Sequence, residues 1–387
     1  MIQPAPFKPR RWLRNGHLQT IVGNFLPRVD RLPAPTSELV PVPLPPEMES
    51  LPEAVALDRV MPSRVLVHCH WQPADGTKAV GRSKESAGPL RQGFAAPTVI
   101  LVHGLEGSSH SQYIVGNANK LWAAGCNVLR MNMRNCGATD ALSPSLYHSG
   151  LSTDVIAVLR WAIGRGCRYV VLAGYSMGGN LVLKAAGELG ADAPPELMGV
   201  VAVSPPMDLR ESADALHGWQ NRVYERRFLR NLRARYLRKT RLFPAVFAPE
   251  PLARVRSIRD FDEWVMAPHC GFRSADDYYQ RAGASRVLRE IAVPTLVLHA
   301  CDDPFIRLTT ATRAQLEAHA EVTLLEPAHG GHCAFLEEPG PGYDGYWAER
   351  ALKDFVLART RAVAADERSP QPVEPAAREP APEVAAC

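Results

Sequence analysis

The chain has 387 residues, of which 46% are hydrophobic and 22% are charged, the composition of a globular protein with a sizeable core. Its length suits one large α/β domain with insertions, or two domains. A net charge of +4 is small for this length, so nucleic acid is not expected as a partner.

Cysteine placement and the absence of long apolar runs exclude further classes. The eight cysteines are scattered and form no C-x-x-C pair, so we expect neither a metal site nor a cofactor. No stretch approaches 18 uninterrupted apolar residues, and residues 1–14 contain no apolar core of a secretory signal. We therefore expect a cytoplasmic protein with reduced thiols.

Proline marks the first part of the chain. It clusters over 4–9 and 27–52, so residues 1–54 are predicted to form an irregular N-terminal arm. His17, within this arm, is predicted to be structural, because no acid or nucleophile lies near it in the sequence.

A larger domain, over 55–358, is predicted to follow. Two strands are expected over 55–60 and 64–71, since the second alternates apolar with polar side chains. Residues 74–96 are rich in Gly, Ser and Lys, which predicts a long exposed loop.

From residue 97 onward, apolar strands alternate with amphipathic helices, the pattern of βαβ units in a parallel sheet. Strands are predicted over 97–103, 127–133, 199–204, 294–299 and 322–326, helices over 113–124, 152–164 and 343–358, and a strand, turn and helix over 169–184. The predicted fold class is therefore α/β, with a mostly parallel central sheet flanked by helices.

Two segments interrupt or follow this alternation. Residues 205–284 are helical and charged, and they are predicted to form a lid over the carboxyl ends of the strands, where open α/β sheets bind ligands. Residues 359–387 are rich in Ala, Pro, Glu and Arg and are predicted to be disordered.

Within the predicted lid, residues 222–241 carry nine lysines and arginines, with apolar residues at nearly helical spacing. This pattern predicts a lid helix with a basic face. The favoured interpretation is an amphipathic helix whose charges face water. The alternative is a peripheral membrane contact, in which the basic face attracts anionic lipid head groups.

The strongest chemical signal is a G-x-S-x-G motif centred on Ser176. An apolar run leads into it and a helix-like run leaves it, as in a nucleophile elbow, where a strained turn exposes the serine hydroxyl. Gly174 and Gly178 leave room around that turn. The N–H groups at the start of the following helix would face a developing oxyanion.

A serine nucleophile needs a base and an acid that orients the base. Asp303 is the predicted acid, because it ends a strand in the order serine, acid, histidine that α/β-hydrolases use. Asp302 is the first alternative and Asp208 the second. His332, preceded by two glycines, is the predicted base, and His329 is its alternative.

An oxyanion hole needs two backbone N–H donors. Met177 follows the nucleophile and is predicted to supply one. Leu105, in the loop after the strand over 97–103, is predicted to supply the other. His103 is expected to hold this loop by hydrogen bonds and not to bind a metal.

Several motifs together are similar to those of a known family. They are GHLQT at 16–20, HGLEGSS at 103–109, YHSG at 147–150, GYSMGGN at 174–180, DDPF at 302–305 and GGH at 330–332. On these motifs the chain resembles the YheT-like family of α/β-hydrolases, whose relatives include eukaryotic abhydrolase-domain lipases and yeast ethanol acyltransferase/esterases.

The resemblance covers roughly residues 7–357. It implies an α/β-hydrolase fold, a Ser176, Asp303 and His332 triad, and activity on acyl esters. Asn135 departs from the family pattern, which has glycine there, and this leaves the shape of one turn open.

The predicted function is that of a serine carboxylesterase acting through an acyl-enzyme on a small-molecule ester. An acyltransferase to an alcohol and a lipase or phospholipase use the same residues, so both stay open. A non-enzymatic binding scaffold is disfavoured by the complete triad. Acyl chain length, the natural alcohol and the oligomeric state do not follow from the sequence.

Overall fold

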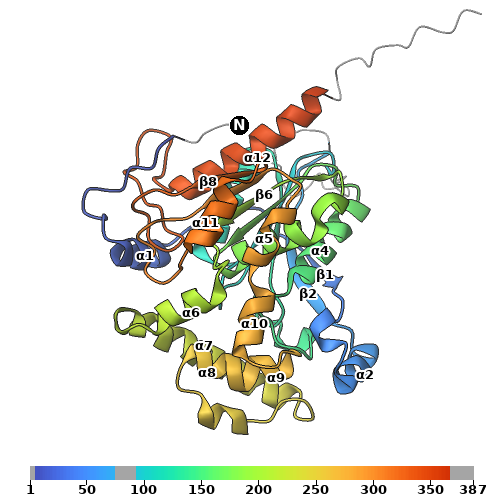
Figure 1. Cartoon of the computed structure of the whole chain (residues 1–387). Helices are drawn as coiled ribbons and strands as arrows, with labels where there is room; N and C mark the ends of the chain where they lie inside the picture. Colours follow the sequence, from blue (N-terminus) through green and yellow to red (C-terminus); the bar gives the residue numbers. More distant parts are fainter. Residues whose placement is uncertain (1–4, 75–92, 367–387) are drawn as a thin grey trace, which may run out of the picture.

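A single mixed sheet forms the centre of the protein, of which the computed structural model describes residues 5–74 and 93–366 (Figure 1). The strand order is β1-β2-β4-β3-β5-β6-β7-β8. The strands are β1 (Thr36–Pro41), β2 (Arg64–His70), β3 (Thr98–Val102), β4 (Asn127–Met131), β5 (Val170–Tyr175), β6 (Leu197–Val203), β7 (Thr295–Leu298) and β8 (Val322–Leu325). The two pairings made by β2 are antiparallel and the others are parallel, which confirms the predicted α/β class.

Helices cover both faces of the sheet. The face that includes Val99 and Leu101 packs against α3 (Gln112–Ala123) and α12 (Trp347–Asp366). The opposite face, with Ile100 and Val102, packs against helices α4, α5 and α11. These three helices span Ser152–Gly164, Met177–Leu189 and Thr310–Glu317. Because successive side chains of β3 point to opposite faces, the continuous apolar strand fills both layers of the core.

The order in which successive strands are added to the sheet changes direction at β3. This strand lies between β4, which follows it in the sequence, and β5, which comes later. In open α/β sheets ligands bind beyond the carboxyl ends of the strands at such a switch point. The loops that follow β3 and β5 are therefore placed at the expected ligand site.

The N-terminal region is more regular than predicted. Instead of an irregular arm it holds α1 (Gly16–Phe25) and the edge strand β1. The strand predicted over 55–60 is wrong, because Pro52–Val60 forms helix α2. Proline at the first helical position favours helix initiation, and the alanines and leucine that follow favour its continuation.

The insertion between β6 and β7 is helical, as predicted, and its helices lie together below the sheet in the view of Figure 1. We call residues 205–284 the helical insertion. It contains α6 (Leu209–His217), α7 (Arg222–Leu242), α8 (Ile258–Phe261), a π-helical segment (Asp262–Met266), α9 (Ala267–His269) and α10 (Ala275–Ala282). Short 3-10 turns lie at Pro46–Met48, Asp140–Leu142, Gly190–Asp192, Trp219–Asn221, Glu250–Arg254, Ala284–Arg286 and Leu288–Glu290.

The C-terminal helix runs further than predicted. α12 continues to Asp366, so the expectation of disorder from residue 359 is wrong for 359–366. The rest of that expectation, and most of the loop predicted over 74–96, lie outside the described residues. Across 5–74 and 93–366, none of the helices combines the length and the apolar character that crossing a bilayer requires.

Candidate active site

Ser176 lies on a sharp turn between β5 and α5. Its backbone is in a strained conformation, with φ 53° and ψ −123°. The two motif glycines are needed because the backbones come very close. A Cβ on Gly174 would lie 2.1 Å from the carbonyl oxygen of Gly178, and one on Gly178 would lie 2.3 Å from that of Val102. The local sequence therefore builds the predicted strand, tight turn and helix.

His332 lies in hydrogen-bond reach of this serine, and Asp303 lies in hydrogen-bond reach of His332. The His332 Nε2 atom is 3.0 Å from Ser176 Oγ, and its Nδ1 atom is 2.8 Å from Asp303 Oδ2. Nδ1–H therefore donates to the carboxylate, which leaves Nε2 to accept from the serine hydroxyl. Gly331, with φ 58°, allows the chain to turn just before the histidine. The structure thus brings together the three residues that the sequence singled out.

The alternative acids and base have other partners. Asp302 accepts the N–H of Gly331 at 2.8 Å, and its carboxylate lies 3.4 Å from His329 Nδ1. Asp208 accepts the backbone N–H of Thr309 and the hydroxyl of Thr312 at the start of α11. These contacts are loop and helix-cap contacts, and none of them reaches Ser176.

The charges around the histidine favour its protonated form. Burial lowers the pKa of His332, but the neighbouring Cys333 sulfur, 3.6 Å from Nε2, and the Asp303 carboxylate raise it more, so the net pKa lies above its usual value. Burial raises the pKa of Asp303, but His332 and the backbone N–H of Ile306 lower it by a larger amount. The net pKa of Asp303 therefore lies below its usual value. Asp303 is thus held as a carboxylate although it is almost completely buried.

The two residues predicted to form the oxyanion hole, Leu105 and Met177, line the same pocket as Ser176. In the part of the chain that the structure describes, the N–H groups of Leu105 and Met177 donate to no acceptor. His103 fixes the loop that carries Leu105, since its Nδ1 bonds the Gly104 carbonyl at 2.8 Å and its Nε2 accepts the N–H of Met133 at 3.1 Å. Burial lowers the pKa of His103 to about 4, so it is neutral. The expected loop-holding contacts of His103 are present.

The loop after β3 has a further support that sequence analysis missed. Glu106 has φ 57° and accepts hydrogen bonds from the Tyr147 hydroxyl at 2.5 Å and from Arg235 Nε at 2.9 Å. Arg235 belongs to α7 of the helical insertion, and its side chain is buried. Its position within the basic run was visible in the sequence, but nothing local marked it as the arginine that faces inward.

The turn at Asn135 keeps the shape that glycine would allow. Asn135 has φ 62°, a left-handed conformation that asparagine tolerates better than most residues. Its side chain donates to the Ser145 carbonyl at 2.7 Å and accepts from Lys239 Nζ at 3.0 Å. The departure from the family pattern is therefore compensated by side-chain hydrogen bonds.

The N-terminal arm supports the histidine loop. Thr20 Oγ1 accepts the backbone N–H of His332 at 2.8 Å and donates to the Gly16 carbonyl at 2.7 Å. A Cβ on Gly16 would lie 2.0 Å from the carbonyl oxygen of Asp302, so the arm is in very close contact with the loops of the site. This gives a structural reason for the GHLQT motif, which lies more than 300 residues from the histidine in sequence.

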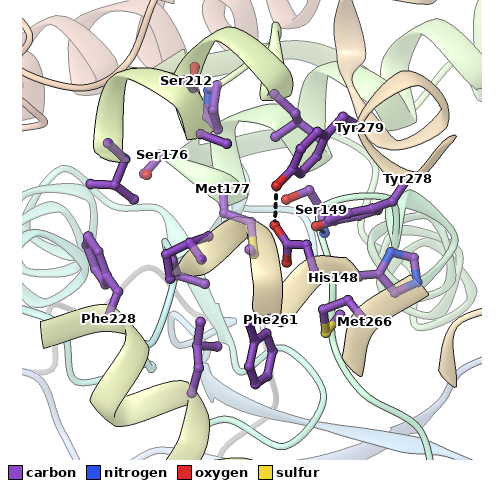
Figure 2. A pocket seen from close by; sticks show the side chains of 18 of the residues that line it. His148, Ser149, Ser176, Met177, Ser212, Phe228, Phe261, Met266, Tyr278 and Tyr279 are labelled. Carbon is purple, nitrogen blue, oxygen red and sulfur yellow. Dashed lines mark hydrogen bonds between the residues drawn. The ribbon is translucent and has the colours of Figure 1, made fainter. Parts of the chain in front are cut away.

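A cavity of about 120 Å³ opens beside Ser176, between the sheet and the helical insertion (Figure 2). Its wall is mostly apolar and includes Leu105, Met177, Phe228, Leu232, Phe261, Met266 and Phe305. Such a wall suits an aliphatic or aromatic chain attached to a reacting group at the serine. Within the described ranges, no group of His, Cys, Asp and Glu side chains is arranged to hold a metal ion.

Comparisons with known proteins identify the family of the chain. The model of the α/β hydrolase family matches residues 99–343. YheT of Escherichia coli, whose name describes it as a candidate esterase, is 34% identical over 245 residues, which cover 62% of this chain and 71% of YheT. The chain therefore belongs to the α/β-hydrolase family, in its YheT-like group, and is a hydrolase.

More distant relatives act on lipids according to their names. Phospholipase ABHD3 of Mus musculus is 29% identical over 265 residues, covering 68% of this chain and 64% of that protein. Monoacylglycerol lipase of Saccharomyces cerevisiae is 26% identical over 264 residues, covering 64% of this chain and 57% of that protein. The matched region thus spans less than two thirds of the length of these two relatives.

Proposed function

We propose that this hydrolase cleaves carboxylic esters by nucleophilic catalysis at Ser176. The observation that carries the proposal is the continuous line of hydrogen bonds from Ser176 through His332 to Asp303, at 3.0 Å and 2.8 Å, at the edge of an apolar cavity. A serine hydroxyl so placed can give its proton, as it attacks, to the neutral form of His332.

The first half of the reaction forms an acyl-enzyme. Ser176 Oγ attacks the ester carbonyl carbon while His332 Nε2 takes the hydroxyl proton. The backbone N–H groups of Leu105 and Met177 stabilise the negative charge on the carbonyl oxygen. When the tetrahedral intermediate collapses, the C–O bond to the alcohol breaks and His332 gives its proton to the departing oxygen. Asp303 orients the imidazole and stabilises its positive charge.

The second half releases the acid. A water molecule attacks the acyl carbon, His332 takes its proton, and Ser176 Oγ leaves and recovers a proton from His332. The sum of the two halves is ester plus water giving acid plus alcohol. The apolar cavity supports an acyl ester of low polarity as the substrate class, and the names of the lipid-cleaving relatives agree with that class.

The test is to replace Ser176 by alanine. The wild-type chain is expected to hydrolyse p-nitrophenyl esters and to be labelled by a fluorophosphonate, whereas Ser176→Ala loses both, with kcat reduced by about 10⁴-fold or more. Ser212→Ala, which removes another hydroxyl from the cavity wall, is expected to keep the label. Residual turnover of more than a few per cent in Ser176→Ala would show that another nucleophile acts.

Products decide between water and an alcohol as the acceptor. With added ethanol, a hydrolase releases mainly free acid, whereas an acyltransferase yields mainly the ethyl ester. If the ethyl ester exceeds the free acid at millimolar ethanol, the reaction of this site is acyl transfer and not hydrolysis.

A further inference from the structure

One carboxyl group interrupts the apolar wall of the cavity. Asp262 begins the π-helical segment of the helical insertion and lines the cavity, and only 9% of its surface is exposed. Single π-helical turns are rare and frequently occur at functional sites. A buried carboxyl group in an otherwise apolar wall costs free energy of folding unless it is fully hydrogen-bonded or paired.

The hydrogen bonds of Asp262 are incomplete. Its Oδ2 atom accepts from the Tyr279 hydroxyl at 2.7 Å, the bond marked by the dashed line in Figure 2. Oδ1 has no hydrogen-bond partner among residues 5–74 and 93–366, and no lysine or arginine of those ranges lies within ion-pair distance. Arg259, the nearby cation, is paired with Asp276 at 2.6 Å.

The electrostatics of Asp262 agree with a missing partner. Burial raises its pKa to about 7, although the Tyr279 hydrogen bond and the charge of Arg259 lower it. Near neutral pH the group is therefore divided between an acid and a carboxylate. A ligand that donates a hydrogen bond, or brings a positive charge, would stabilise the carboxylate form.

An ionised carboxylate can only accept hydrogen bonds, so the complement of the free Oδ1 is a donor. Ser176 lines the same cavity, so a chain that extends into the cavity from a carbonyl at Ser176 can meet Asp262. We propose that the acyl chain of the substrate carries a hydrogen-bond donor, a hydroxyl or an ammonium group, which binds Asp262 Oδ1. This inference rests on the proposed esterase function and names the substrate class for the same site.

The surroundings of Asp262 suit both kinds of donor. The rings of Tyr278 and Tyr279 line the cavity with their centroids 5.4 Å apart, and the Phe261 ring lines it as well. Aromatic faces attract an ammonium group, and they also exclude water from a hydroxyl bound to the carboxylate. The two sources of the donor are distinguished by experiment.

The experiment uses p-nitrophenyl esters with acyl chains of four to ten carbons. At each chain length it compares three esters, whose chains end in a methyl, a hydroxyl or an amino group. Full-length wild-type protein is expected to hydrolyse at least one donor-bearing ester with kcat/KM roughly tenfold or more above its methyl counterpart. The variants are Asp262→Asn, which is close in shape, and the double variant Asp262→Leu with Tyr279→Phe, which leaves no hydroxyl unpaired. Glu263→Gln is the matched control, because Glu263 lies in the same segment but bonds the Ala275 N–H and does not line the cavity.

The pattern of losses identifies the donor. If the amino ester is preferred, Asp262→Asn removes the preference, because the amide carries no charge. If the hydroxyl ester is preferred, Asp262→Asn keeps part of the preference and the double variant removes it. Glu263→Gln keeps the wild-type ratio in either case.

Two results would overturn the inference. In the first, the wild-type protein hydrolyses the methyl ester at every chain length with the same kcat/KM as both donor-bearing esters. In the second, a preference for a donor-bearing ester survives in the double variant. Failure of the proposed function looks different. In that case no ester is hydrolysed, or Ser176→Ala hydrolyses the methyl ester as fast as wild type.

Discussion

Asp302 and Asp303 are adjacent in sequence, yet their carboxyl groups have different surroundings. The side chain of Asp303 is fully buried and bonds His332, whereas that of Asp302 is 21% exposed and lies beside the partly exposed His329. A carboxylate that orients a catalytic imidazole must be desolvated and fixed, because its charge then acts on one ring only. Only Asp303 meets both conditions.

Asp303→Asn is expected to lower kcat by about 10⁴-fold, because the amide no longer favours the imidazole form that accepts the serine proton. Asp302→Asn and Asp208→Asn are expected to lower it by less than about tenfold. Steady-state kinetics on one p-nitrophenyl ester, with circular dichroism as the folding control, makes the comparison. A loss of similar size in either control variant would move the acid to that residue.

The raised pKa of His332 has a consequence for the pH profile. A general base acts in its neutral form, so kcat/KM is expected to rise with pH through the pKa of His332, above the usual value near 6.5. The Cys333 sulfur is one cause of that rise. Cys333→Ala is therefore expected to shift the acidic limb of the profile to lower pH. An unchanged limb, or one displaced to higher pH, would contradict this assignment.

The residues found from the sequence are those whose signals are local. Ser176 lies in a five-residue motif, and His332 follows two glycines. Thr20 and Arg235 support the same site from positions far away in the sequence, and a hydrogen bond between distant segments leaves no local pattern. Their roles followed only from the folded chain.

Among the elements, α7 has two distinct sides. Arg235 and Lys239 are buried against the loops after β3 and β4, which the basic-face interpretation did not anticipate. Arg222, Arg226, Arg227 and Arg230 are exposed. Large apolar side chains are exposed beside them, at Phe25, Trp219 and Val223, and the Arg227 guanidinium lies 5.4 Å from the centre of the Phe25 ring.

This side of α7 is expected to bind vesicles that contain anionic lipid, since exposed arginines beside exposed aromatic rings suit a lipid head-group region. Co-sedimentation should need anionic lipid and weaken between low and physiological salt. Replacing Arg222, Arg226, Arg227 and Arg230 by glutamine should reduce it strongly, whereas the same change at exposed Arg59, Arg64, Arg160 and Arg289 should not. If both quadruple variants bind vesicles equally, or if the wild-type protein does not bind, the arginines of α7 do not contact lipid. The exposed side of the helix then only faces water.

Errors in the predicted elements arose at the proline-rich start. β1 was missed because proline in a strand usually argues against it, but Pro41 lies at the end of an edge strand, where its missing N–H is tolerated. The short apolar run of α2 fits the period of a helix or of a strand, so the pattern alone wrongly favours a strand there. From β3 onward the buried strands and most amphipathic helices give clear signals, and the strands lie close to their predicted bounds. Helix α11 was not predicted, and α12 begins and ends later than predicted.

In the molecule as a whole, the N-terminal arm packs against the segment that follows His332. Leu13 is fully buried in a small apolar cluster with Ala334 and Leu336. The Gln19 side chain donates to the Leu13 carbonyl and accepts the N–H of Leu336. The N-terminal arm thus completes the packing around the segment that follows His332.

Thr20→Val is expected to lower kcat roughly fivefold to tenfold with little change in KM, because the loss of one hydrogen bond, worth about 1 kcal/mol, loosens the backbone at His332. Thr240→Val is the matched control, because its hydroxyl bonds a backbone carbonyl within α7. Equal kcat values for wild type and Thr20→Val, at equal melting temperature, would show that the arm does not position the histidine.

The contact between Arg235 and Glu106 limits how such a protein can diversify. The helical insertion supplies much of the cavity wall, so exchanging it between relatives would be the obvious route to a new substrate range. In this chain, however, the same insertion also braces the loop that carries Leu105. A chimera that inherits a foreign insertion without matching partners for Glu106 and Tyr147 would gain a new chamber and lose the geometry of its reaction centre, so these residues must be inherited as one block.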